Sequence, residues 1–266
     1  MKKMKKTILV AVPILIILFC AFGYLFAPND PNHVNLTVRL ERPCEEYPLG
    51  TDHMGRCILS RILYGGRTTV GIVLIGSAIV IVVGTFLGLV LGQKGNKQNV
   101  VVESILNAVT AIPPIAYLMI FIGAWGNGVL TMLIALTVSL IMRLIKLVKT
   151  KTEIEIEKAY IMCAIASGAS RGRILFVHIV PNLIKDVIHY ICLSCTDMIM
   201  AIVGFSFIGI GLGDNVIDWG IMVSESRGVI IMRPDIILYP IAFIFLCALS
   251  FNLIAGAVEK GGEIRA

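Results

Sequence analysis

The sequence predicts an all-α integral membrane protein with six transmembrane helices. Of its 266 residues, 57% are hydrophobic and only 15% are charged, and the mean hydropathy is +0.90. A soluble domain carries about 25% charged residues, so this chain has too little charge to cover a water-exposed surface. The composition therefore excludes an ordinary cytosolic enzyme, a disordered regulator and a small disulfide-linked scaffold.

The six spans follow from stretches without charge, because a helix needs about 20 apolar residues to cross a bilayer. The first apolar stretch is longer than the roughly 7–15 residues typical of a signal peptide, and a proline stands where cleavage would occur, so we expect it to be retained. The longest stretch accommodates two helices, separated by the turn-forming residues 125–128. The predicted spans lie within residues 7–27, 68–93, 104–142 (two helices), 187–213 and 236–258.

The distribution of lysine and arginine predicts the orientation. With the N-terminus inside, the segments on the cytoplasmic side hold 16 of these residues and the outer segments hold seven. The positive-inside rule then places both termini in the cytoplasm. The same basic residues flank apolar spans and form no stripe interleaved with aromatic residues, so the expected partner is membrane lipid and not nucleic acid.

Two features of the spans predict how they pack. Gly84, Gly88 and Gly92 recur every four residues and form a smooth ridge that a neighbouring helix can approach closely, although glycine is also simply common in membrane helices. Pro113 and Pro114 fall in the middle of the third span and are expected to kink it.

The chain carries no recognisable catalytic motif. It lacks a G-x-x-x-x-G-K-[ST] phosphate loop, an H-E-x-x-H motif and a nucleophile elbow, so we expect neither ATP hydrolysis nor a cofactor in this chain. Seven cysteines are an odd number without framework spacing. Cys192 and Cys195 lack a second ligand pair, which favours helix packing over zinc. Whether Cys44 and Cys57 pair with each other stays open.

Few polar groups stand out as candidates for a transport site. Asp197 is the only ionisable residue deep within a predicted span, and such a residue is costly unless it faces a cavity or a partner. It therefore lines a translocation path or forms hydrogen bonds between helices. His33 and His53 lie in the outer segment, where they could contact a metal or have no such role; no metal site is assigned.

The largest inner loop predicts a cytoplasmic knob. A helical stretch ends at Gly168, which can adopt the left-handed conformation that closes a helix, and Ser170 can cap a second short helix that Pro181 stops. The loop is too apolar for a simple solvated segment. Its apolar residues, which suit docking on a partner, are Ile161, Ala164, Ile165, Ala169, Ile174 and Leu175.

The outer segment before the second span has a helical pattern of its own. At 100° per residue, Arg56, Ser60, Tyr64 and Arg67 share one face, and apolar residues fill the other. Thr51 or Asp52 is the expected helix cap. We predict an amphipathic helix at the membrane interface, which either meets a partner protein or anchors the chain to the membrane surface.

Three stretches resemble the permeases of dipeptide, oligopeptide and nickel ABC importers, over about residues 34–254. The inner loop is similar to their E-A-A loop, with Met162, Cys163 and Ala164 in place of Glu-Ala-Ala, then Gly168 and Ala169, and Pro181 at the end. The outer stretch is similar to L-G-T-D-x-x-G-R-D and matches at Gly50, Thr51, Asp52, Gly55, Arg56 and Arg67, with Cys57 replacing the aspartate. Residues 205–213 and 218–222 resemble a third signature.

This resemblance implies a type I importer permease in the bacterial cytoplasmic membrane. The implied partners are a second homologous permease subunit, two ATPase subunits that bind ATP and Mg, and an extracytoplasmic solute-binding protein. The loop would couple ATP hydrolysis to alternating access. The implied organisation is residues 1–67 (first helix and outer segment), residues 68–258 (core, with the coupling loop at about 149–182) and residues 259–266 (tail).

The substrate is expected to be nickel or a metal chelate, because the compact outer segment is more similar to nickel permeases; a di- or oligopeptide is the alternative. An autonomous channel or secondary carrier is a more remote alternative. It would need a row of polar groups through the membrane, and Asp197 is the only candidate.

Overall fold

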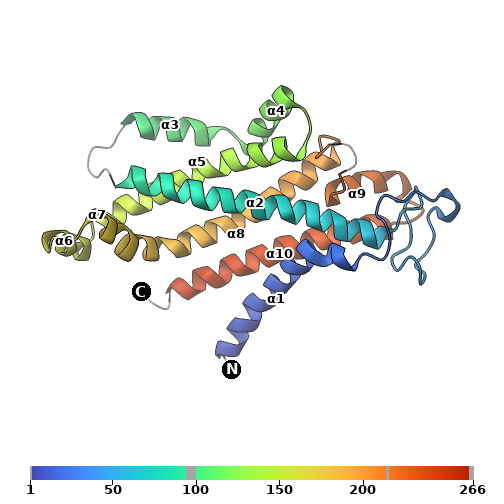
Figure 1. Ribbon diagram of the computed structural model, residues 1–266, viewed down its shortest axis with the longest axis horizontal. Coiled ribbons are helices and arrows are strands. Elements are labelled where there is room, and N and C mark those ends of the chain that lie inside the picture. The colour runs from blue at the N-terminus through green and yellow to red at the C-terminus, as the bar shows by residue number, and fades with distance from the viewer. Residues whose placement is uncertain (1, 94–99, 214–215, 264–266) are drawn as a thin grey trace.

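The computed structural model describes residues 2–93, 100–213 and 216–263, and every regular element in these residues is a helix (Figure 1). The all-α prediction is confirmed. Five long helices form the body: α1 (Lys2–Phe22), α2 (Ile58–Gly92), α5 (Val129–Ile156), α8 (Val180–Phe207) and α10 (Asp235–Glu263). The shorter helices are α3 (Val100–Ala111), α4 (Pro114–Trp125), α6 (Ala159–Ala166), α7 (Arg171–Arg173) and α9 (Trp219–Ser226). Short 3₁₀ turns occupy Gly23–Phe26, Leu36–Val38 and Arg227–Val229.

The third predicted span is broken into two half-helices. α3 and α4 have 12 residues each and are bent by 81° relative to each other at Pro113 and Pro114. Pro113 is extended because the following proline disfavours helical backbone, and Pro114 starts α4. Each half is about 18 Å long, too short to cross a hydrocarbon core of about 30 Å alone. The described residues therefore contain five helices long and apolar enough to span a membrane, or six spans if the broken pair counts as one.

The glycine ridge of α2 lets this helix pack closely against α5. A Cβ atom at Gly84 would lie 2.9 Å from Leu144 Cδ2, at Gly88 2.6 Å from Val148 Cβ, and at Gly92 2.6 Å from Thr152 Cβ. The partners on α5 also recur every four residues, so the two helices interlock along the same row. The predicted packing role of the three glycines is confirmed.

The remaining helices pack around this pair. α8 packs on α10, and α1 packs on both α10 and α2. α9 covers the outer end of α2, where the buried Trp219 donates its indole N–H to the carbonyl of Ile62 at 3.0 Å. Lys149 on α5 is buried and pairs with Glu103 on α3, which ties the first half of the broken span to the body.

The inner loop departs from the prediction at Pro181. The chain from Arg171 continues through a π-helical segment, Ile174–Ile179, directly into α8, and Pro181 lies in the first turn of α8. A proline inside a helix leaves a carbonyl one turn earlier without a donor, and a π-helical turn shifts the hydrogen-bond register at that point. Pro181 therefore does not stop the helix.

The outer stretch also differs from the predicted interfacial helix. Residues 58–67 are the first turns of α2, so the boundary placed at residue 67 lies inside that helix. Cys57 is the N-cap residue, in place of Thr51 or Asp52. Ser60 and Arg61 are buried, since α9 and the preceding loop cover the polar side of these turns.

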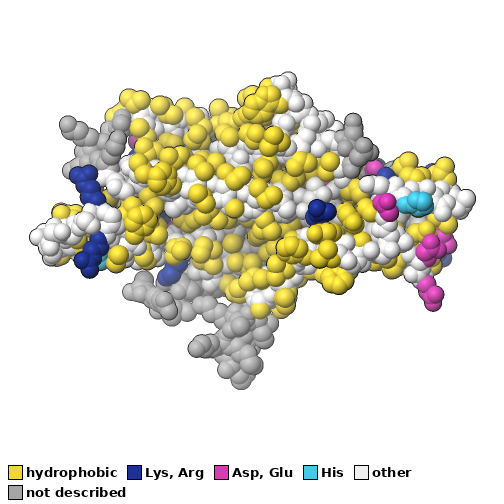
Figure 2. Space-filling view, in the orientation of Figure 1, with side chains coloured by type: hydrophobic (Ala, Val, Ile, Leu, Met, Phe, Trp, Pro, Cys, Tyr) yellow, Lys and Arg dark blue, Asp and Glu magenta, His cyan; other side chains and the backbone are white. Residues whose placement is uncertain are grey.

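The two ends of the molecule differ in charge. In Figure 2, hydrophobic side chains cover most of the visible middle, basic side chains gather near the end that carries α6, and acidic and histidine side chains lie at the opposite end. Residues 28–57 form that opposite end, whereas both chain termini point away from it (Figure 1). Lys94, Lys97 and Arg265, which the orientation argument includes, lie outside the described residues.

Candidate functional site

The knob at one end of the molecule consists of residues 158–175, with α6 at its tip (Figure 1). Met162 and Ile165 lie three residues apart on α6, and they are 59% and 49% exposed. Cys163 is also exposed. The knob therefore presents apolar side chains to its surroundings, as expected for a docking surface. Ile161, Ile174 and Leu175, which we expected in that surface, are buried inside the knob.

A hydrogen-bonded turn fixes the end of α6. Gly168 has a φ of +80°, the left-handed conformation that closes a helix. Its amide donates to Ile165 O at 2.9 Å and the Ala169 amide donates to Ala164 O at 3.0 Å, the pair of bonds of a Schellman motif. Ser170 caps α7 by accepting a bond from the Arg173 amide. The predicted helix-closing turn at Gly168 and the predicted helix cap at Ser170 are confirmed.

A polar cluster braces the base of the knob, and sequence reasoning missed it. Glu155 at the end of α5 accepts hydrogen bonds from the Tyr160 hydroxyl and from Asn182 Nδ2 (2.9 Å) on α8. Lys158 pairs with the same carboxylate at 2.6 Å. Burial, together with the bond to Glu155, raises the pKa of Tyr160 to about 12, so its hydroxyl stays protonated and donates. These residues join the knob to two transmembrane helices.

A pocket of about 590 Å³ lies between α4, α5 and α8. Asp197 on α8 and Arg143 on α5 both line it. Asp197 is exposed and Arg143 is half-buried in this chain, and neither forms a salt bridge within the part of the chain that the structure describes. A hydrogen bond from Asp197 to another helix, one of its two predicted roles, is not present among those residues. The position of Asp197 in a pocket favours the other predicted role, the lining of a translocation path.

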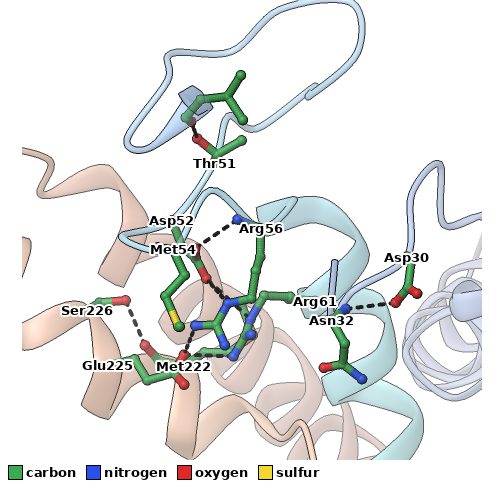
Figure 3. Close-up of polar contacts among 11 residues, drawn as sticks. Asp30, Asn32, Thr51, Asp52, Met54, Arg56, Arg61, Met222, Glu225 and Ser226 are labelled. Carbon is green, nitrogen blue, oxygen red and sulfur yellow. Dashed lines mark hydrogen bonds and ion pairs between the residues drawn. The ribbon is translucent and has the colours of Figure 1, made fainter. Parts of the chain in front are cut away.

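At the opposite end, four charged side chains form an ion-pair cluster, in which Asp52, Arg56 and Arg61 are buried and Glu225 is half-buried (Figure 3). Arg56 pairs with Asp52 at 2.7 Å and with Glu225 at 2.8 Å, and Arg61 pairs with Glu225 at 2.7 Å. Asp52 also accepts the backbone amides of Met54 and Arg56 at 2.8 and 3.0 Å. The cluster joins the outer loop, the start of α2 and α9.

The other residues of the outer signature support this folded loop. Gly55 has a φ of +74°, and a Cβ atom there would lie 1.8 Å from Asn35 O, so only glycine fits. Gly50 likewise has a positive φ. Thr51 is fully buried and bonds to Val38 O and the Glu41 amide. Arg67 lies apart from them and stacks on the Tyr24 ring at 4.4 Å.

One set of side chains has the spacing of metal ligands. Potential ligand atoms of Asp52, His53 and Glu225 lie within 4.8 Å of one another. However, two of these carboxylates are already paired with Arg56 and Arg61, whose permanent positive charges oppose a cation. The ion pairs account for the two carboxylates without a metal.

Removing Glu225 is expected to destabilise the protein strongly. Glu225→Ala leaves the guanidinium groups of Arg56 and Arg61 inside the protein with one acceptor fewer. Breaking a buried pair in this way costs about 3 kcal/mol. Thermal unfolding of the purified protein in detergent measures the loss.

The exposed ion pair between Lys151 and Asp186 (2.9 Å) serves as the control, because both side chains are more than 40% exposed. Asp186→Ala is expected to cost less than about 1 kcal/mol. Equal losses for the two variants would show that the outer cluster contributes no more than a surface ion pair.

Comparison with known proteins finds a matching family and similar transport permeases. The model of the family described as "Binding-protein-dependent transport system inner membrane component" matches residues 84–261. The dipeptide transport system permease protein of Alkalihalophilus pseudofirmus is 31% identical over 262 residues, which cover 97% of this chain and 86% of the relative. The probable D,D-dipeptide permease of Escherichia coli is 28% identical (92% and 83% covered), and the nickel permease of the same species is 25% identical (92% and 88% covered).

Proposed function

Because this chain belongs to the family of binding-protein-dependent transport system inner membrane components and is an ABC importer permease, we propose that its substrate is a di- or oligopeptide. The observation that carries the proposal is the relative that is named as a dipeptide permease, which is 31% identical over 97% of the chain. The sequence-based preference for nickel has less support, since the nickel permease is 25% identical over 92%. The pocket between α4, α5 and α8 also favours peptides, because the positive charge of Arg143 in its lining offsets the attraction of Asp197 for a metal cation.

The partners follow from the family. A binding-protein-dependent importer needs an extracytoplasmic solute-binding protein and ATPase subunits, and this chain is the transport permease and not the ATPase. The proposed complex contains a second homologous permease subunit and two ATPase subunits, which bind ATP and Mg. The chain itself needs no cofactor. The exposed pocket around Asp197 forms half of the translocation path, and the second permease closes it.

The knob is the proposed coupling element. Met162 and Ile165 offer an apolar surface to an ATPase groove, and the Glu155 cluster transmits the movement to α5 and α8. Coupling of this kind is a free-energy link between two sites through an element with two positions. Met162 stands where the family has glutamate. Its exposure leaves room for Met162→Glu, which is expected to be tolerated.

The proposed topology has the knob and both termini in the cytoplasm, and two exposed cysteines test it. Cys44 and Cys163 are exposed at opposite ends of the molecule, and Cys57, which is 2% exposed, is expected to stay unlabelled in the folded protein. Cys44 and Cys57 are both free, so a disulfide does not protect Cys44.

An impermeant maleimide added to intact cells is expected to label Cys44 and not Cys163. In inside-out vesicles, the pattern is expected to reverse. Labelling of Cys163 in intact cells would place the knob outside and overturn both the topology and the coupling role.

Uptake in cells tests the proposed substrate directly. Cells that carry the gene and cells that lack it are supplied with a radiolabelled dipeptide or with ⁶³Ni²⁺. The proposal expects dipeptide uptake to depend on the gene and nickel uptake not to depend on it. Gene-dependent uptake of nickel alone would restore the nickel assignment, and purification of the chain without an ATPase would favour an autonomous carrier.

A further inference from the structure

The pocket between α4, α5 and α8 has an unusual charge pattern for the interior of a membrane protein. Asp197 and Arg143 are the charged members among the described residues that line it, and they carry opposite charges. Both belong to helices that are long and apolar enough to span the membrane. Charges at such positions are costly and mark functional sites unless they neutralise each other. These two do not form a salt bridge with each other within the described part of the chain.

The rest of the lining is apolar and adaptable. Two methionines, Met198 and Met200, lie beside Asp197, and Leu136 and Leu140 lie on the α5 side. A methionine side chain adapts to ligands of varied shape, since its thioether chain is flexible and polarizable. The volume of about 590 Å³ is within the range of small-molecule pockets, about 300–1,000 Å³. The pocket thus combines two fixed charges of opposite sign with walls that do not select one side-chain shape.

We propose that Asp197 and Arg143 recognise the two charged ends of a zwitterionic peptide as it passes through the permease. Arg143 binds the terminal carboxylate through its planar guanidinium group, which matches a carboxylate with two parallel hydrogen bonds. Asp197 accepts hydrogen bonds from the terminal ammonium group. Both charged ends are common to all linear dipeptides, whereas their side chains vary and meet the apolar walls. The inference rests on the proposed peptide substrate and adds which groups of the peptide are recognised.

The positive charge of Arg143 opposes a bare metal cation and offsets the attraction of Asp197 for it. A nickel site needs several nitrogen, oxygen or sulfur donors around one point, and the pocket offers one carboxylate beside a permanently charged arginine. A zwitterion, in contrast, cancels both charges of the pocket at once.

The test uses uptake of three forms of one peptide by the complete complex in vesicles. The forms are alanyl-alanine, its N-acetyl derivative and its C-terminal amide, each supplied at a concentration that saturates the solute-binding protein. Arg143→Gln is expected to slow uptake of the two forms with a free carboxylate about tenfold and to leave the amide unchanged. Asp197→Asn is expected to slow the two forms with a free amine and to leave the N-acetyl form unchanged. Arg143→Lys is expected to restore part of the uptake.

The matched controls are Lys151→Gln and Asp186→Asn, which remove charges from the same two helices outside this pocket. They are expected to leave uptake of all three forms unchanged. If each pocket variant slows all three forms equally, or none, terminal recognition by these residues is contradicted while peptide transport stands. If the wild-type complex imports none of the peptides, the proposed function itself fails.

Discussion

Replacing Gly88 by leucine is expected to prevent α2 from packing on α5. Even a Cβ atom at this position would lie 2.6 Å from Val148 Cβ and 3.0 Å from the carbonyl oxygen of Ile145. The first contact is close to the helix backbone and the second is part of it, so neither group can rotate away. Adding a single methyl group to a tightly packed core costs about 1–3 kcal/mol, and a leucine side chain adds more. We expect Gly88→Ala to lower the melting temperature in detergent and Gly88→Leu to abolish the folded complex.

Gly71 on the same helix is the matched control, since a Cβ atom there would have no neighbour within 4 Å. Gly71→Ala is expected to be neutral or slightly stabilising, because alanine favours helix more than glycine does. Equal melting temperatures for Gly88→Ala and Gly71→Ala would show that α2 and α5 are not in close contact.

Replacing Gly168 by valine is expected to lower transport-coupled ATP hydrolysis sharply. A β-branched residue at a φ of +80° is strained, and the left-handed conformation costs an ordinary residue about 1–2 kcal/mol. A Cβ atom at Gly168 would have no neighbour within 4 Å, so the effect comes from backbone strain and not from a clash. A cost of this size lowers the population of the docking-competent turn roughly tenfold. The measurement is the rate of peptide-stimulated ATP hydrolysis by the reconstituted complex, and we expect this rate to fall.

Gly168→Asn is the control, because asparagine tolerates the left-handed conformation better than other side chains do. It is expected to retain most of the coupled activity. Since the knob lies outside the membrane spans, both variants are expected to insert and to bind the loaded solute-binding protein normally. Normal coupled hydrolysis and import by Gly168→Val would show that this turn has no part in coupling.

Local patterns predicted the features that depend on neighbours in the sequence. The glycine ridge, the Gly168 turn and the break at Pro113 all follow from backbone geometry that one or two residue types dictate. Asp197 stood out because a single charge in an apolar stretch is visible without knowing the fold.

Features that depend on residues far apart in the sequence could not be predicted from it. Glu225 meets Arg61 across 164 residues, and Asn182 meets Glu155 across 27, with no repeat or spacing to connect them. The amphipathic pattern of residues 56–67 was interpreted as an interfacial helix. Arg56 and Ser60 on its polar face are instead buried by other parts of the same chain, whereas Arg67 is exposed. Hydrophobic periodicity does not distinguish a protein surface from a membrane surface as the neighbour of such a face. Pro181 was expected to end a helix, and the π-helical turn before it permits the helix to continue.

Photo-crosslinking from the knob tests the central claim, that this surface docks on the ATPase, most directly. Cys163 is exposed on α6. Of the cysteines that the structure describes, only Cys44 is also exposed, so a Cys44→Ser background leaves Cys163 as the site of labelling. Benzophenone maleimide attached to Cys163 in the purified complex reacts on illumination with whatever lies against it. The account predicts a product that contains this chain and an ATPase subunit. If the ATPase co-purifies and Cys163 instead crosslinks to the solute-binding protein or to lipid alone, the knob is not the docking surface.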